Sequence, residues 1–183
     1  MISVGIKRLN ENATIPTKAH PTDSGFDIYA SEDVIIEPGE TTVVPTGIAV
    51  ELPAGYEATV RPRSGITAKT KLRVQLGTID NAYRGEIGVI VDNIERPTLY
   101  LDDNPQEIYE DLTALISTID GGDYILDGFA KDGAYIIRKG DRIAQLVIQP
   151  LPAVEAYEIE DELEETERGE NGFGSTGVSK EAE

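Results

Sequence analysis

The sequence contains no cysteine and no tryptophan, and it has only one methionine and one histidine among 183 residues. Without cysteine, the chain forms no disulfide, no thiolate metal site and no cysteine nucleophile. No stretch approaches the roughly 20 consecutive apolar residues of a membrane-spanning helix. Residues 1–4 lead directly into an alternating pattern, unlike the basic and then apolar segments of a signal peptide. These absences predict a globular protein of the cytoplasm.

Basic residues are also few: 16 Lys and Arg against 34 Asp and Glu give a net charge of −18. Taken alone, this charge argues against nucleic acid as a partner. The excess acid is local, because residues 94–133 hold ten acids and two bases, and residues 155–183 hold eleven acids and two bases. Such clustering leaves room for a basic run elsewhere, which is more often a solvated surface but allows a local anion site. The basic run without any acid comprises Arg61, Arg63, Lys69, Lys71 and Arg73.

The first half of the chain predicts many short strands. From Val4 to about Ile90, apolar or alternating runs are divided by turn residues such as Pro38-Gly39 and Pro53-Ala54-Gly55. Turns that recur every 8–12 residues or so are typical of a sandwich, a jelly roll or a barrel, and not of alternating βαβ units. The length suits one domain, since domains most often have about 100–150 residues. We therefore predict an all-β domain over residues 1–154.

Two segments depart from this β pattern. In residues 94–133, apolar side chains recur at helical spacing, with Asn104 and Pro105 suited to a helix start and Gly121 to a helix end. The apolar positions are Ile108, Leu112, Leu115, Ile116 and Ile119. We expect an acidic, partly helical insertion there. Residues 155–183 combine an acidic linker with a glycine-rich end, which predicts a flexible C-terminal arm.

Three further segments carry residues suited to chemistry. Arg61-Pro62-Arg63-Ser64-Gly65 places two guanidinium groups and a hydroxyl beside a glycine, a combination that suits phosphate oxygens. Lys139 to Val147 runs from a turn into an apolar strand. The run from Arg168 to Gly177 holds four glycines, two hydroxyls and Phe173. This last pattern is typical either of a phosphate-binding loop with a stacking ring or of a disordered tail.

Gly77 to Gly85 predicts a β-hairpin with a polar tip between two glycines. Asp80 at this tip is either a turn residue or a general base that polarises water. Tyr83 is either half-buried packing or a platform for a ligand. The spacing alone does not decide between these alternatives.

Taken in chain order, these pieces resemble the five motifs of the trimeric dUTPase family, over nearly the whole chain apart from the insertion. The resemblance implies a jelly-roll-like homotrimer, with sites between subunits, that hydrolyses dUTP to dUMP and pyrophosphate. Such an enzyme keeps uracil out of DNA and supplies dUMP for dTMP synthesis. The matching segments are Asp23-Ser24-Gly25-Phe26-Asp27-Ile28-Tyr29-Ala30, Arg61 to Gly65, Gly77 to Gly85, Gly140 to Leu146, and Arg168 to Gly177.

The resemblance also implies roles for individual residues. Asp80 would activate the water that attacks the α-phosphorus, and Mg²⁺, held mainly by the substrate phosphates, would contact Asp27 through water. Tyr83 would press on the sugar and exclude a 2′-hydroxyl, the hairpin backbone would pair with uracil, and Phe173 would stack on uracil as the arm closes. The implied substrate-binding residues are Arg63, Ser64, Gly65, Leu76, Gly77, Thr78, Ile79, Tyr83, Gln145, Arg168, Phe173, Gly174, Ser175 and Thr176.

The insertion at 94–133 is longer than the short link that the family generally has between its third and fourth motifs. It is similar in position to insertions of dUTPases from phages of Gram-positive bacteria. This likeness implies a host-cell cytoplasm as the location and a regulatory protein, such as a repressor, as a partner of the insertion. The alternative is that its apolar residues only pack the predicted helix on the trimer surface. Two other functions stay open, a dCTP deaminase on the same fold and a regulatory protein with a vestigial site.

Overall fold

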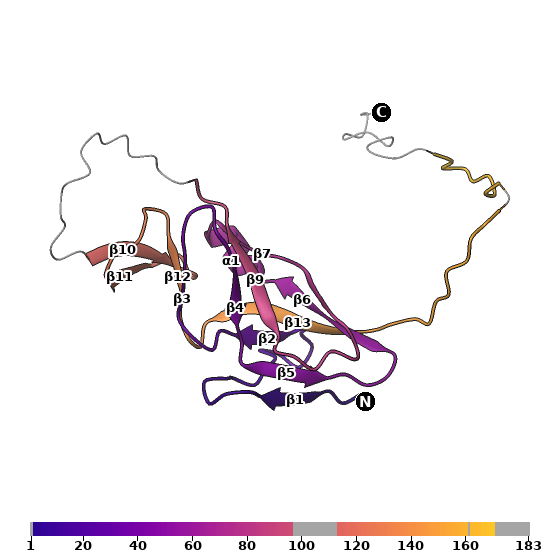
Figure 1. Cartoon of the computed structure of the whole chain (residues 1–183), viewed down its shortest axis with the longest axis horizontal. Helices are drawn as coiled ribbons and strands as arrows, with labels where there is room; N and C mark the ends of the chain where they lie inside the picture. Colours follow the sequence, from indigo (N-terminus) through magenta and orange to yellow (C-terminus); the bar gives the residue numbers. More distant parts are fainter. Residues whose placement is uncertain (1, 97–112, 161, 171–183) are drawn as a thin grey trace. The chain divides into compact units, whose positions relative to one another are not determined.

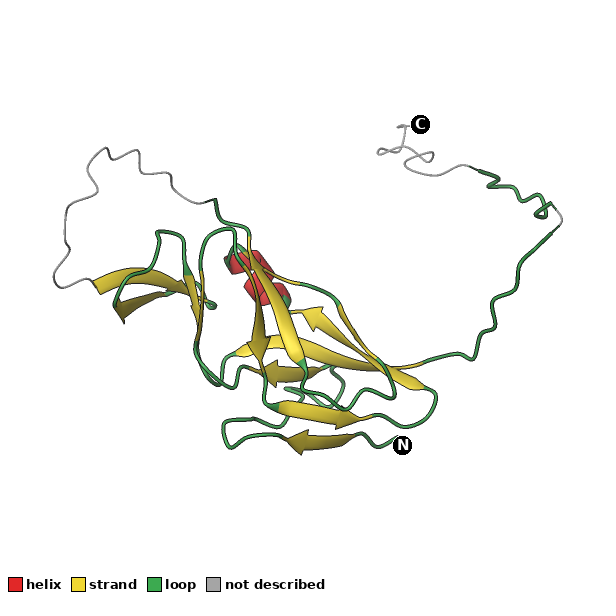
Figure 2. Cartoon of the chain, viewed as in Figure 1, coloured by secondary structure: helices red, strands yellow, loops and turns green. Residues whose placement is uncertain are grey.

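The computed structural model describes residues 2–96, 113–160 and 162–170 (Figure 1). By its internal contacts the chain divides into two compact units, Met1–Pro152 and Ala153–Glu183. All strands and the helix of the described residues belong to the first unit (Figure 2). Within the described part of the chain, no helix has the length and apolar character that crossing a bilayer requires.

The described residues form 13 strands and one short helix. These elements are β1 (Gly5–Arg8), β2 (Phe26–Tyr29), β3 (Val34–Ile36), β4 (Thr41–Pro45), β5 (Ile48–Glu51), β6 (Tyr56–Pro62), α1 (Ser64–Lys69), β7 (Leu72–Val74), β8 (Gly77–Ile79), β9 (Gly88–Asn93), β10 (Thr113–Thr118), β11 (Asp123–Asp127), β12 (Tyr135–Ile137) and β13 (Arg142–Pro150).

The strands form four sheets, with orders β1-β5, β2-β13-β6-β8, β4-β9-β7 and β11-β10-β12-β3. Strands of all four sheets contribute to one apolar core, which includes Ile28, Ile36, Ile48, Leu72 and Ile143, all less than 2% exposed. Burying such side chains against one another is the main favourable term in folding. The predicted all-β fold class is confirmed.

The prediction of a helix as far as Ile119 is wrong where the structure describes it. Thr113–Thr118 is strand β10, which pairs antiparallel with β11 and parallel with β12. Leu115 is 66% exposed and Ile116 is 3% exposed, so two neighbours predicted on one helix face lie on opposite faces of a sheet. The other predicted helix positions, Asn104, Pro105, Ile108 and Leu112, lie outside the described residues.

Tertiary packing explains why this segment is extended. Ile116 lies in a small apolar cluster with Ala134 and Ile136, against which Tyr124 and Leu126 of β11 pack. Three of the six residues of β10 are β-branched threonines or isoleucine at positions 113, 116 and 118, a composition that favours strand over helix. The apolar spacing is compatible with a helix, but the cluster that buries every second residue of β10 forms only when β11, β12 and the distant strand β3 fold together.

Asn93, at the end of β9, joins three segments of the first unit. It is only 1% exposed, and its Nδ2 donates to the carbonyl oxygens of Ile36 at 3.0 Å and Gly133 at 2.9 Å. Its Oδ1 accepts from the N–H of Glu95 at 3.0 Å. A buried amide is tolerated because all three of these hydrogen bonds are made. Asn93 therefore connects β3, β9 and the loop before β12.

We expect Asn93→Ala to lower the free energy of unfolding by about 2–4 kcal/mol, since it leaves buried carbonyl and N–H groups without partners and opens a small cavity. Urea unfolding followed by circular dichroism measures this loss. Asn12→Ala is the matched control, because Asn12 is exposed and its side chain accepts a single hydrogen bond from Lys139 Nζ. We expect the control to change stability by less than about 0.5 kcal/mol. Equal losses in both variants would contradict the role given to Asn93.

Candidate active site

A buried carboxylate, Asp27 of β2, lies between two guanidinium groups. Arg63 Nε is 3.2 Å from Asp27 Oδ1, and Arg142 Nη1 is 3.3 Å from Asp27 Oδ2. Asp27 is 5% exposed, and a charge at such a depth requires oppositely charged partners. Gln145 lies directly opposite Asp27 in the β2–β13 pairing. The structure thus brings together four residues, Asp27, Arg63, Arg142 and Gln145, which we call the Asp27 cluster.

Asp27 retains one unused acceptor. Its Oδ1 is buried and accepts no hydrogen bond from the described residues, since Arg63 Nε lies within ion-pair distance but without hydrogen-bond geometry. Buried polar atoms without a hydrogen bond are uncommon and call for a missing partner such as a water or an ion. Among the described residues, no three His, Asp or Glu side chains gather in a way that could hold a metal ion. Asp27 could therefore contact a water molecule, including a water bound to a metal ion. The described residues do not supply a set of protein ligands that would bind the metal directly.

Arg63, Ser64 and Gly65 lie where β6 passes into α1. Arg63 has extended backbone, with φ −92° and ψ 127°, and its Nη1 donates to the carbonyl oxygen of Arg142 at 3.0 Å. Ser64 and Gly65 are exposed in the first turn of α1, whose N–H groups have no acceptor within a helix. No atom lies within 4 Å of the place where a Cβ of Gly65 would be, so its backbone can be approached closely. Guanidinium, hydroxyl and open N–H groups at one turn are suited to phosphate oxygens.

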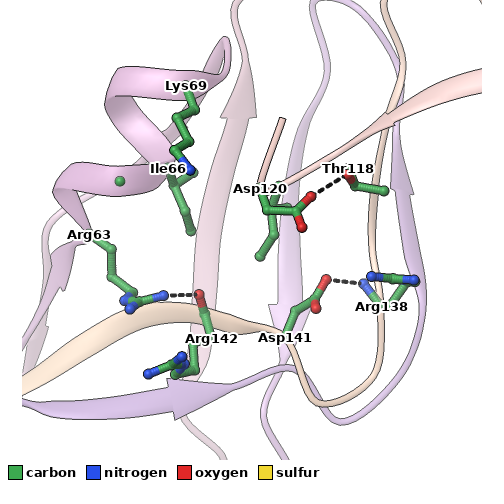
Figure 3. Close-up of a pocket in the computed structure, with 10 residues that line it drawn as sticks. Arg63, Ile66, Lys69, Thr118, Asp120, Arg138, Asp141 and Arg142 are labelled. Carbon is green, nitrogen blue, oxygen red and sulfur yellow. Dashed lines mark hydrogen bonds between the residues drawn. The ribbon is translucent and has the colours of Figure 1, made fainter. Parts of the chain in front are cut away.

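A cavity of about 320 Å³ adjoins the Asp27 cluster (Figure 3). One wall of the cavity comes from α1, and a second comes from Thr118 at the end of β10 and from Ile119 and Asp120, which follow it. The residues around the β12–β13 turn, including Arg138, form the rest of the lining. Figure 3 shows Arg63 reaching toward the carbonyl of Arg142 and Asp120 turned toward Thr118. No local sequence pattern predicts this wall, because only tertiary packing brings the insertion beside α1.

Asp120 is held ionised in this wall. The Thr118 hydroxyl donates to its Oδ1 at 2.5 Å and the Gly122 N–H donates to the same atom at 3.3 Å, and together these bonds lower the pKa of the Asp120 carboxyl. Hydrogen bonds to a carboxylate favour its charged form. The lining of the cavity therefore includes a fixed negative charge contributed by the insertion, beside the cations of α1 and of the β12–β13 turn.

The predicted β-hairpin over Gly77 to Gly85 is wrong, because β8 pairs with β6 while β9, the next strand, pairs with β4 and β7 in another sheet. Residues 80–87 form a loop between the two sheets, which we call the Asp80 loop, and its tip carries Asp80 and Tyr83. Strand β8 ends at buried Ile79, after which Asp80 is exposed and its carbonyl accepts the N–H of Tyr83 at 3.0 Å. The Tyr83 hydroxyl donates to the carbonyl of Glu86 at 2.9 Å. A Cβ on Gly85 would lie 2.6 Å from Cζ of Tyr83, so the ring lies against the glycine and any larger residue there would displace it. The tip therefore presents a carboxylate and a fixed ring outward.

Within one chain, the length of strand β6 separates this tip from the Asp27 cluster. Strand β6 pairs with β8 at Ala58↔Ile79 and with β13 at Pro62↔Ala144, so Asp80 lies near one end of β6 and Arg63 follows the other end. Six residues of strand at about 3.3 Å each span roughly 20 Å. Within a single chain, Asp80 and Tyr83 are thus not placed beside Arg63.

The remaining predicted site residues lie elsewhere. Leu76 is exposed just before β8, and Gly77, Thr78 and Ile79 make up that strand, the last in its sheet. Arg168 belongs to the second unit. Four of the predicted positions, Phe173, Gly174, Ser175 and Thr176, lie outside the described residues.

Comparison with known proteins gives consistent matches. Residues 11–105 and 130–177 match the family model described as dUTPase. The deoxyuridine 5′-triphosphate nucleotidohydrolase of Alkaliphilus metalliredigens is 36% identical over 180 residues, which cover 97% of this chain and 99% of that protein. The part between the two matched ranges, 106–129, falls within the insertion.

Two solved structures of phage proteins are similar as well. One is the dUTPase of phage phi11 of S. aureus, described for its species-specific insert, with a TM-score of 0.78 and 34% identity over 87% of this chain and 97% of that chain. The other is the dUTPase of Staphylococcus bacteriophage 80alpha with dUPNHPP, with a TM-score of 0.82 and 36% identity over 97% of this chain and all of that chain. The latter is described in connection with control of the transfer of virulence genes by a G protein-like mechanism.

Proposed function

This chain belongs to the dUTPase family and hydrolyses dUTP to dUMP and pyrophosphate, and we propose that Asp80 activates the attacking water. The observation that carries this role is the position of Asp80, an exposed carboxylate on the Asp80 loop, between buried Ile79 and the hydrogen-bonded residues Asn81 and Tyr83. A general base needs an accessible carboxylate held at a defined place. From there it accepts a proton from the water as that water attacks the α-phosphorus in line with the leaving pyrophosphate.

The Asp27 cluster fits the phosphates. Arg63, Ser64 and Gly65 would bind phosphate oxygens through a guanidinium, a hydroxyl and backbone N–H groups, and Gln145 would contribute near the α-phosphate. Asp27 holds the Arg63 and Arg142 guanidinium groups at 3.2 and 3.3 Å and so fixes their orientation. Mg²⁺ bound to the phosphates would neutralise the charge that develops on pyrophosphate. The unused Oδ1 of Asp27 suits a water on that ion.

Strand β8 and the Asp80 loop would bind the nucleoside. β8 is the last strand of its sheet, so one edge of Gly77–Ile79 keeps its N–H and C=O groups available for the polar edge of uracil. The Tyr83 ring, fixed against Gly85, would exclude a 2′-hydroxyl. From the second unit, Phe173 and Gly174 would cover the base, while Arg168, Ser175 and Thr176 would bind the outer phosphates and exclude water.

A site of this kind requires more than one copy of the chain. The roughly 20 Å of strand between the Asp27 cluster and Asp80 is too long for both to contact one α-phosphorus. A neighbouring copy that brings its own Asp80 loop to this cluster would complete the site. We therefore propose a homotrimer in which each active site is formed by residues of more than one copy. We also propose that the protein acts in the cytoplasm.

The β4-β9-β7 sheet offers a face for such a neighbour. Val43 lies opposite Ile90 in the β4–β9 pairing, and both side chains are exposed, as is Ile94 beyond β9. On the same face, Asp92 accepts a hydrogen bond from the Thr41 hydroxyl at 2.7 Å, so this carboxylate already has a hydrogen-bond partner within the chain. Apolar side chains around satisfied polar groups are typical of subunit interfaces.

A second candidate function, docking of a regulatory protein, is favoured by the insertion hairpin β10–β11. Leu115 lies opposite Ile125, and both are exposed, at 66% and 69%. Exposed Asp123 and Asp127 flank Ile125 on the same strand. Because this face is acidic, two copies of it would repel each other, and it fits a partner whose apolar patch is surrounded by bases. A DNA-binding repressor is a protein of this chemistry.

The activity predicts selective release of pyrophosphate from dUTP with Mg²⁺, measured beside UTP, dCTP and dTTP. We expect Asp80→Asn to lower kcat by about 10²- to 10⁴-fold, because the amide cannot accept the proton from water. The fold should be unchanged, as circular dichroism will check. Ammonia release from dCTP would support the deaminase alternative, and full activity of Asp80→Asn would remove Asp80 from the mechanism.

A shared site predicts complementation between inactive variants. Asp80→Asn and Arg63→Gln should each be inactive alone, yet co-refolded mixtures should recover activity. Random assembly leaves about one quarter of the shared sites with both wild-type groups, so recovery should approach one quarter of wild-type turnover. Sedimentation of each variant alone confirms that it assembles. A site built within one chain would give no recovery.

If the β10–β11 face binds a repressor, a substitution on that face should weaken repressor binding without changing dUTP hydrolysis. We expect Leu115→Asp to weaken binding of a basic repressor by at least about tenfold, because a charge replaces an apolar contact at the centre of the face. Turnover of dUTP should stay within about twofold of wild type. Val154→Asp is the matched control, since Val154 is an exposed apolar residue in the second unit. Equal repressor binding by wild type and Leu115→Asp, in a titration followed by release of operator DNA, would contradict this surface.

A further inference from the structure

The tip of the Asp80 loop is attached to the rest of the first unit by the side chain next to Asp80. Asn81 Nδ2 lies 2.7 Å from the carbonyl oxygen of Pro53, 3.1 Å from that of Tyr56 and 3.3 Å from that of Leu52. An amide group has two N–H donors, so one of the three contacts is shared. The shortest contact, to Pro53, is the main anchor. Asn81 is partly buried against this turn, which joins β5 to β6.

The turn that receives Asn81 is itself fixed. Leu52 is buried in the core, and the N–H of Tyr56 donates to the carbonyl of Pro53 at 3.2 Å. The N–H of Leu151, just after β13, donates to the carbonyl of Gly55 at 2.8 Å. The acceptors of the Asn81 amide therefore belong to a segment held by the core and by the end of β13. A hydrogen bond to such a segment positions whatever carries it.

On the other side of the tip, the Tyr83 hydroxyl donates to the carbonyl of Glu86, whose Oε1 accepts from the N–H groups of Thr46 at 3.1 Å and Gly47 at 2.7 Å. Further hydrogen bonds are internal to the tip. The Tyr83 N–H donates to the backbone carbonyl oxygen of Asp80, and Arg84 Nη1 donates to the carbonyl oxygens of Asn81 at 2.6 Å and Tyr83 at 2.8 Å. These contacts shape the turn without tying it to the body. On its other side, Asp80 follows buried Ile79, which is paired with Ala58. The Asp80 backbone is thus held between a core residue and the Asn81 anchor.

We propose that Asn81 is a positioning residue for the reaction, which rests on the proposed function of Asp80. By fixing the tip to the Leu52–Tyr56 turn, the Asn81 amide sets where Asp80 and Tyr83 stand relative to the nucleotide. Displacing a catalytic group by about 1 Å can slow a reaction roughly 100-fold. The Asn81 side chain itself is directed at the protein's own carbonyl groups and takes no part in proton transfer.

The test compares Asn81→Ala, Asn81→Gln and Ala82→Ser with wild type. We expect Asn81→Ala to lower kcat roughly 10- to 100-fold with KM within about twofold, so that kcat and kcat/KM fall together. It should bind the unreactive analogue dUpNHpp with unchanged stoichiometry, which a partly unfolded protein would not do. Asn81→Gln keeps both N–H donors and should recover part of kcat. Ala82→Ser alters the next exposed tip residue and should behave as wild type.

Three results would overturn the proposal. The first is a kcat of Asn81→Ala within twofold of wild type, and the second is a loss of dUpNHpp binding sites in proportion to the loss of kcat. The third is equal kcat in the Ala and Gln variants, because the donors would then be irrelevant. Failure of the proposed function is a separate outcome, since it would show as no pyrophosphate release by wild type or as full activity of Asp80→Asn.

Discussion

Strand β6 places both halves of the active site, because it is hydrogen-bonded along both of its edges. On one edge it pairs with β13 from Tyr56↔Pro150 to Pro62↔Ala144, and β13 in turn pairs with β2, which carries Asp27. On the other edge it pairs with β8, which leads into the tip of the Asp80 loop. The same strand therefore positions the Asp27 cluster and Asp80 and keeps them apart within one chain, which supports the proposed shared site.

Electrostatics permits an anionic substrate on a chain of net charge −18. Most of the excess acid lies in the insertion and in residues 155–183, whereas the Asp27 cluster has two guanidinium groups for one carboxylate. Exposed charges more than about 10 Å apart are largely screened at physiological salt. Around the cavity, the four cations Arg63, Lys69, Arg138 and Arg142 outnumber the three carboxylates Asp27, Asp120 and Asp141, so the local charge favours phosphates.

The insertion contributes to the body of the molecule as well as to its surface. Its strand β10 buries Ile116 and exposes Leu115, and the turn that follows forms one wall of the cavity beside the Asp27 cluster. Asp120 in that wall is held by Thr118 and Gly122. A partner bound to the exposed face of this hairpin would therefore contact an element that also lines the phosphate side of the site.

The sequence by itself determined the all-β class, the turn at Asp80 and the family, since these depend on local alternation, turn residues and motifs read along the chain. Tertiary structure alone decided three things: that Thr113–Thr118 is a strand, that Asn81 and Asn93 are anchors, and that Asp80 and Arg63 lie at opposite ends of β6. The physical reason is the same for each. Apolar spacing and single asparagines are compatible with several local conformations, and the choice is made by hydrogen-bond partners and buried neighbours that are distant in sequence.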